Sequence, residues 1–214
     1  MLNKISIPKS ILMLMGLALV LNILRVLIYD RYSFVYILWN IFLAFIPYLI
    51  SSILSHYSYH HKLNQLVFIS GGIIWLVFLP NAPYIVTDLI HIGVVRGVPV
   101  LFDSILLFTS AWLGLLLGMT SLYQMEKIFL TKYSKKFTVR LIALIILLTS
   151  FGMHIGRSFR FNSWDLFTGP FSFFGKLLNI LSQSTKHIEA LIYTLLFFSF
   201  IYVFYQSWKS SQIK

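Results

Sequence analysis

The sequence predicts an all-α fold: a polytopic membrane helix bundle with about six transmembrane helices. Of its 214 residues, 58% are hydrophobic and only 11% are charged, whereas a soluble domain has roughly 25% charged residues. Its mean hydropathy is +0.84. The apolar residues fall in continuous runs of about 20, the length needed to cross a bilayer, and barrel strands would instead alternate with a period of two. A soluble enzyme, a disordered tail and a fibrous protein are therefore excluded.

A single transmembrane domain is expected over residues 1–214. The spans in it cover about residues 11–29, 36–54, 63–79, 100–123, 138–155 and 187–208. The first span follows Lys4 and Lys9, as the apolar part of a signal peptide would. It is longer than the usual 7–15 or so residues of that part, and no small-residue cleavage site follows it. We interpret it as a retained helix.

A short helix is expected between the third and fourth spans, over about residues 82–92. Pro80 and Pro83 end the third helix, because proline lacks the N–H that a helix interior needs. Asn81 is a suitable N-cap. The residues with the spacing of one helix face are Tyr84, Thr87, Asp88 and His91. The helix is therefore amphipathic; it lies at the interface or re-enters the membrane, with its polar face toward the bundle interior.

A second polar segment prolongs the fifth span. His154, Arg157 and Arg160 follow one another at intervals of three, so neighbouring pairs share a helix face. Asp165 comes shortly after, in the first turn of another short helix.

The formal net charge of +11 indicates orientation rather than nucleic-acid binding. Six spans put both termini and the second and fourth loops on one side, which carries ten basic residues and one acid. The other side carries seven basic residues and five acids. The positive-inside rule then places both termini in the cytoplasm, with the chain in the cell (cytoplasmic) membrane. The loop over residues 126–140 is basic and serves as a topology signal or lies on anionic lipid. Cysteine is absent, which excludes thiol catalysis and disulfides.

This topology brings the polar residues together at the outer leaflet, where Arg25, Asn40 and Asp103 join the two polar segments. Charges inside a membrane are costly and usually pair at an interior site. The candidate catalytic residues are Asp88, His91 and His154. The candidate substrate-binding residues are Arg157, Arg160, Tyr84, Asn81, Asp103 and Asp165.

Asp88 and His91 can form an acid–base pair, because a carboxylate orients an imidazole that titrates near neutral pH. Arg157 and Arg160 can clamp a phosphate or carboxylate. A lipid-linked or anionic small substrate at the outer leaflet fits this set, as enzyme or binder. The alternatives are a structural ion-pair network, a small transporter or channel with a discontinuous helix, and an accessory membrane subunit. No metal is assigned, because no HExxH-type spacing occurs, and the cofactor is left open.

Small residues recur on one face of the fourth span, at Ser110, Gly114 and Gly118. Such a stripe allows close packing of helices. It serves an internal neighbour or, as the alternative, a homo-oligomer. Membrane lipid is the other expected partner, and nucleic acid is not.

The run at residues 78–91, Phe-Leu-Pro-Asn-Ala-Pro-Tyr-Ile-Val-Thr-Asp-Leu-Ile-His, resembles a known family. So do the Phe102-Asp103 pair and the segment Arg160-Phe-Asn-Ser-Trp-Asp165. Together they are similar to the bacterial integral membrane proteins catalogued as domain of unknown function 1361. The resemblance covers most of the chain. It implies a multi-pass bacterial membrane protein of unassigned activity and carries over no catalytic residues.

Overall fold

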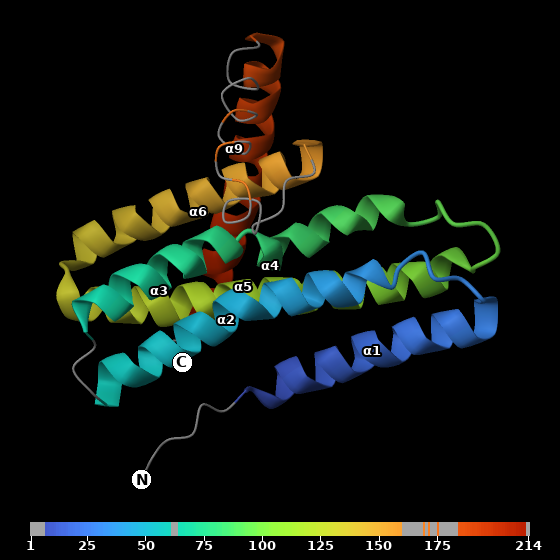
Figure 1. The fold of residues 1–214 in the computed structure, drawn as a ribbon, viewed down its shortest axis with the longest axis horizontal. Coiled ribbons are helices and arrows are strands. Elements are labelled where there is room, and N and C mark those ends of the chain that lie inside the picture. The colour runs from blue at the N-terminus through green and yellow to red at the C-terminus, as the bar shows by residue number, and fades with distance from the viewer. Residues whose placement is uncertain are drawn as a thin grey trace. The chain divides into compact units, whose positions relative to one another are not determined.

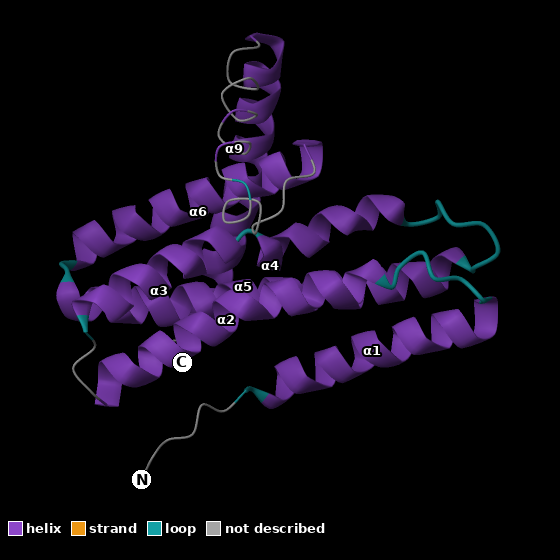
Figure 2. Cartoon of the chain, in the orientation of Figure 1, coloured by secondary structure: helices purple, strands orange, loops and turns teal. Residues whose placement is uncertain are grey.

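The structure is a computed structural model that describes residues 7–60, 64–159 and 184–212, with the single residues 169, 171 and 175. Figures 1 and 2 show that these residues form helices and loops without a strand. The helices, in chain order, are α1 (Lys9–Tyr29), α2 (Tyr36–His60), α3 (Gln65–Phe78), α4 (Asn81–Tyr84), the 3₁₀ helix η1 (Ile85–His91), α5 (Val100–Lys132), α6 (Lys135–Phe159) and α9 (Ser184–Ser211). The all-α prediction is confirmed. Among the described residues, six stretches are long and apolar enough to cross a membrane.

The chain divides into two compact units. Unit 1 comprises residues 1–132 and contains α1 to α5 with η1, and unit 2 comprises residues 133–214 and contains α6 and α9. Each unit is described by itself.

Helix α5 is the centre of unit 1, where α1, α2, α4 and η1 all pack against it. In Figure 1, α1, α2 and α5 run lengthwise beside one another. Its 33 residues reach about 50 Å at 1.5 Å per residue, which exceeds the roughly 30 Å hydrocarbon core. The core of unit 1 includes Ile37, Ile41, Leu106, Leu113 and Leu117.

Helix α1 buries only a narrow stripe, which consists of Ile11, Ala18, Asn22 and Arg25. The rest of the helix exposes large apolar side chains such as Met13 and Leu27. Their outward position suits a helix with lipid on most of its sides. The buried stripe packs on α5, and its last member is charged.

The third span is interrupted. Helix α3 has 14 residues, about 21 Å, which is too short to cross the core alone. The chain continues as the four residues of α4 and then as η1. The α-helix expected over residues 82–92 is therefore wrong in its geometry. Ile85, Val86 and Thr87 are β-branched, which disfavours an α-helix, and Thr87 Oγ1 donates to the Tyr84 carbonyl at 2.8 Å.

The change of helix type alters which residues share a face. A 3₁₀ helix has three residues per turn, so Ile85, Asp88 and His91 line up and Tyr84 does not. Both α4 and η1 pack against α2 and α5. The interrupted segment thus lies within unit 1, between these two helices.

The small residues of α5 explain how α4 fits there. A Cβ on Gly114 would overlap the Ala82 carbonyl oxygen, at 2.4 Å. A Cβ on Gly118 would lie 3.2 Å from the Ala82 Cβ. The internal-packing interpretation of this stripe is confirmed, and a homo-oligomer stays a prediction.

Hydrogen bonds between polar side chains also connect α2, α3 and α5. The sequence analysis did not single out these side chains. Trp75 Nε1 donates to Ser121 Oγ at 2.7 Å, and Ser121 Oγ donates to the Pro47 carbonyl at 3.0 Å. The Ser121 hydroxyl of α5 thus joins the indole of α3 to the backbone of α2. Farther along, Ser51 and Ser52 both donate to Gln124 Oε1, at 2.7 and 3.2 Å. These polar atoms satisfy one another, which is what a buried structural network requires.

The basic loop expected over residues 126–140 is almost entirely helical. Helix α5 ends at Lys132 and α6 begins at Lys135, so only two residues connect them. Glu126 is buried on α5. The ammonium group of Lys132 lies 3.7 Å from the centre of the Phe68 ring. This basic side chain covers an aromatic ring of its own unit.

Candidate functional site

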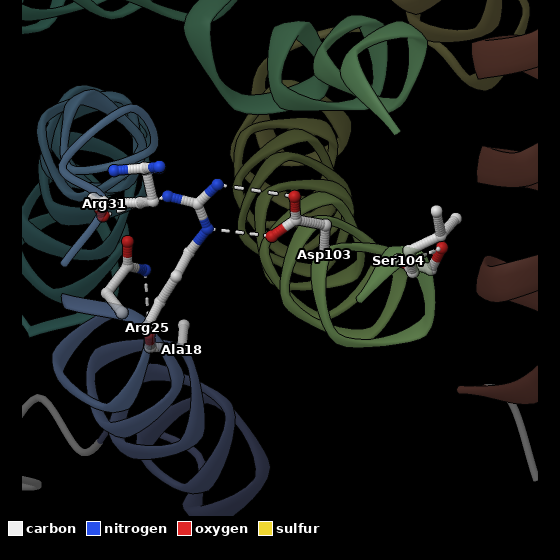
Figure 3. A network of polar contacts seen from close by, with 7 residues as sticks. Ala18, Arg25, Arg31, Asp103 and Ser104 are labelled. Atoms are coloured by element: carbon white, nitrogen blue, oxygen red, sulfur yellow. Dashed lines mark hydrogen bonds and ion pairs between the residues drawn. The ribbon is translucent and has the colours of Figure 1, made fainter. Parts of the chain in front are cut away.

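One end of unit 1 collects the polar residues that the sequence singled out. We call it the Asp103 end; it comprises the end of α1, the beginnings of α2 and α5, η1, and the loops over residues 30–35 and 92–99. Its first feature is an ion pair between α1 and α5. Arg25 Nε donates to Asp103 Oδ1 at 2.8 Å and Arg25 Nη2 to Asp103 Oδ2 at 3.3 Å (Figure 3). Both side chains are 1% exposed.

Arg25 makes further contacts that fix the first loop. Its Nη1 donates to the Arg31 carbonyl at 3.0 Å, and its guanidinium carbon lies 4.2 Å from the centre of the Phe34 ring. Asp30 ends α1 in the left-handed region, at φ 50°, which turns the chain back so that the Arg31 carbonyl can meet Arg25. This pairing uses both carboxylate oxygens of Asp103, and its expected contact with a substrate stays a prediction.

The second feature is a buried carboxylate on η1. Asp88 is 2% exposed, and Asn40 Nδ2 from α2 donates to Asp88 Oδ2 at 3.1 Å. The amide fixes the plane of the carboxylate, and packing of η1 against α2 and α5 shields it. Water cannot solvate a charge in this position, so hydrogen bonds from the protein have to stabilise the carboxylate.

His91 follows Asp88 by one turn of η1, on the same face. The two α-carbons are separated by about 6 Å along the axis, at 2.0 Å of rise per residue. Asp88 is buried, whereas His91 is half-buried. The pair therefore runs from the interior of unit 1 toward its surface.

The two other candidates on this segment serve the backbone. Asn81 Nδ2 donates to the Phe78 carbonyl at 2.9 Å. The N-cap of α4 is Pro80, without a side-chain cap, so the expected capping role of Asn81 is wrong. In a continuous α-helix the Ala82 N–H would bind the Phe78 carbonyl, but here it donates to the Leu79 carbonyl at 3.1 Å, and the Asn81 amide takes its place. Tyr84 is half-buried, and its carbonyl accepts the Thr87 hydroxyl.

The remaining candidates belong to unit 2. His154, on α6, is 3% exposed. Its ring stacks on Tyr193 of α9, with centroids 5.6 Å apart and planes at 12°. Ser158 Oγ lies 3.3 Å from His154 Nδ1. Arg157 is half-buried one turn from His154.

Arg160 and Asp165 lie outside the described residues. Asp88, His91 and Asp103 are in unit 1, and His154 and Arg157 are in unit 2. The single cluster that joins all of them stays a prediction. Within the described ranges, no group of three or more His, Asp or Glu side chains is arranged to hold a metal ion.

Comparison with known proteins identifies a family for this chain. The model of a family described as "Protein of unknown function (DUF1361)" matches residues 39–204. This range contains Asp88, His91 and Asp103 and leaves out Arg25 and all of α1. No curated protein and no solved structure matches the chain.

Proposed function

Because the chain belongs to the DUF1361 family of proteins of unknown function, its activity has to be inferred from its residues, and we propose a membrane-embedded acid–base site. In this proposal Asp88 and His91 bind or process a lipid-linked or anionic small substrate. Asp88 orients the imidazole, and His91 exchanges the proton with the substrate. The observation that carries the proposal is the burial of the Asp88 carboxylate in an interrupted helix.

Two physical arguments support a functional role for this carboxylate. Ionisable side chains inside membrane proteins are expensive, so they are kept mainly where a substrate, an ion or a proton has to be handled. Non-helical backbone at membrane depth is tolerated only where protein or a water-filled cavity surrounds it. The α-helical span is interrupted at Leu79 and Pro80, and the 3₁₀ helix η1 then carries Asp88 between α2 and α5, where protein surrounds it.

Asp88 and His91 have different roles in this proposal. Asn40 holds one oxygen of Asp88, which fixes the carboxylate on the η1 face that also carries His91. A neighbouring carboxylate can orient an imidazole, and a half-buried imidazole can still reach a bound molecule. His91 is therefore the proton-exchanging group and Asp88 the orienting group. The positions of Arg157 and Arg160 around the same substrate remain part of the prediction made from sequence.

The membrane orientation belongs to the same proposal. In this proposal the termini lie in the cytoplasm of a bacterium and the Asp103 end lies at the outer leaflet of the cytoplasmic membrane, an orientation that the positive-inside rule supports. The loops at this end carry arginines, Arg31 and Arg96, whereas Lys127 and Lys132 lie toward the other end of α5. Arginine suits fixed pairing with phosphate or carboxylate, and lysine suits a solvated anchor.

The test is complementation of a strain that lacks the gene. Asp88→Asn and His91→Gln keep size and hydrogen bonding but remove the carboxylate and the imidazole. We expect both variants to reach the membrane at the wild-type level and to fail to complement. A matched control is His56→Gln, because His56 is also half-buried but lies near the far end of α2. Full complementation by the first two variants would refute the proposal.

A transporter is the second candidate, and the interrupted α3–α4–η1 span favours it. Discontinuous helices form the substrate sites of many transporters. Uptake of candidate solutes into proteoliposomes separates the two functions. Flux that Asp88→Asn abolishes favours transport, and a substrate converted without flux favours the acid–base site.

A further inference from the structure

We propose that Arg31 and Arg96 form a binding site for the phosphate group of an anionic lipid at the Asp103 end. This inference rests on the proposed function and names the class of its substrate, a phosphate-bearing lipid. The anion would contact two loops of unit 1, and both loops lie outside the two polar segments that the sequence analysis singled out.

Arg31 is held in place by its backbone, and its guanidinium is available. Its carbonyl accepts Arg25 Nη1 at 3.0 Å, which fixes the loop over residues 30–35. The side chain is exposed, and Figure 3 shows it beside the Arg25 guanidinium. Its Nη1 donates to the Asp30 carbonyl at 3.4 Å. Most of its five N–H donors thus remain for a ligand.

The same guanidinium reaches the second loop. Arg31 Nη2 and Nε lie 3.5 and 3.9 Å from the position that a Cβ would take on Gly97. Gly97 adopts φ +87°, a left-handed conformation that glycine accepts without strain. Arg96, which precedes Gly97 directly, is exposed. The turn at Gly97 therefore sets Arg96 beside the loop that carries Arg31.

Neither arginine is neutralised within unit 1. Among the described residues, no carboxylate lies within ion-pair distance of Arg31 or Arg96. Asp103 is taken by Arg25, and Asp88 is buried on η1. A guanidinium group without a carboxylate partner can donate two parallel N–H bonds to the oxygens of a phosphate. Arg31 and Arg96 supply two such groups.

The position of the two loops suits a lipid headgroup. The loops connect the ends of stretches long enough to cross a membrane: one joins α1 to α2, and the other joins the stretch that ends with η1 to α5. Tyr32, which follows Arg31, and Tyr36, at the start of α2, are exposed, and tyrosines concentrate where the hydrocarbon core meets water. The second loop follows His91 directly, and the His91 carbonyl accepts the Val94 N–H of this loop at 3.2 Å. A phosphate on Arg31 and Arg96 would thus be bound by a loop that directly follows the proposed acid–base residue.

Lipid titration followed by native mass spectrometry tests the site. The full-length protein in an uncharged detergent is titrated with phosphatidylglycerol and, separately, with diacylglycerol, which lacks the phosphate. We expect tight binding of phosphatidylglycerol alone. Arg31→Gln and Arg96→Gln should each weaken it about fivefold, the range expected for one charge-assisted contact at an exposed position. Arg31→Lys should weaken it as well, because lysine cannot make the paired contact.

Arg140→Gln is the matched control, since Arg140 is also exposed and its loss changes the net charge equally. It should bind phosphatidylglycerol as the wild type does. Equal affinity of the wild type, Arg31→Gln and Arg96→Gln would overturn the proposal, and so would equal binding of diacylglycerol. An excess of inorganic phosphate that displaces the lipid shows that the site recognises the phosphate group itself; if the lipid stays bound, the site requires the whole headgroup. The titration needs no enzymatic activity, so its failure is distinct from a failure of the complementation test.

Discussion

Replacing one partner of the Arg25–Asp103 pair should destabilise unit 1 far more than replacing both. The two side chains are each 1% exposed, so neither solvent nor salt can compensate a charge that is left alone. Breaking a buried pair from one side typically costs about 3–5 kcal/mol. We therefore expect Asp103→Asn to lower the free energy of unfolding by about 3–5 kcal/mol.

Arg25→Met should be the more severe single variant. It also removes the hydrogen bond to the Arg31 carbonyl and the contact with the Phe34 ring. A hydrogen bond is worth about 1 kcal/mol net, and a desolvated cation–π contact up to about 2 kcal/mol. The double variant Arg25→Met with Asp103→Asn leaves no charge at either of the two positions. It should be no less stable than Arg25→Met alone, because replacing a whole ion pair is often close to neutral.

The assay is reversible unfolding in mixed micelles, followed by tryptophan fluorescence and analysed as a double-mutant cycle. The cycle should give a coupling of at least about 3 kcal/mol between positions 25 and 103. A double variant that loses the sum of the two single effects would show that the charges do not stabilise each other, and the reasoning would be refuted.

Two further variants test the packing of unit 1 by the same unfolding measurement. Gly114→Ala should lose about 1–3 kcal/mol, because its Cβ would overlap a backbone carbonyl of α4, whereas Gly72→Ala has nothing within 4 Å and should be neutral or stabilising; equal effects at both positions would contradict the close approach of α4. Ser121→Ala should lose about 1–3 kcal/mol, because it leaves an indole N–H and a proline carbonyl without their buried partner. Its control, Ser70→Ala, removes an exposed bond within one helix and should change stability by less than about 0.5 kcal/mol, so a Ser121→Ala variant that behaves like it would contradict the network.

The sequence predicted the spans because apolar length is a local property that a bilayer enforces. Pro80 and Pro83 likewise marked the break in the third span, since the missing N–H acts at the position itself. The helix after the break was harder to predict. An α-helical spacing put Tyr84 on the polar face, whereas the β-branched run at residues 85–87 gives a 3₁₀ helix and puts Ile85 there.

Partners across the bundle were the least predictable part of the site. The sequence brought Arg25, Asn40, Asp88 and Asp103 to one end of the bundle, but spacing cannot say which charge meets which. In the structure Arg25 forms an ion pair with Asp103, and Asn40 donates a hydrogen bond to Asp88. Trp75 and Ser121 were missed because each is unremarkable in its own helix. Their hydrogen bond depends on the Pro47 carbonyl, which lies on a third helix.

The acid–base site is tested most directly by lipid analysis of a gene-deletion strain. Membrane lipids would be compared by mass spectrometry after complementation with the wild type, Asp88→Asn, His91→Gln or the His56→Gln control, all at equal expression. We expect a phosphate-bearing lipid to accumulate in the deletion strain, to disappear with the wild type and His56→Gln, and to persist with Asp88→Asn and His91→Gln. Clearance of that lipid by the Asp88 and His91 variants, or a lipid profile that the deletion leaves unchanged, would contradict the assignment.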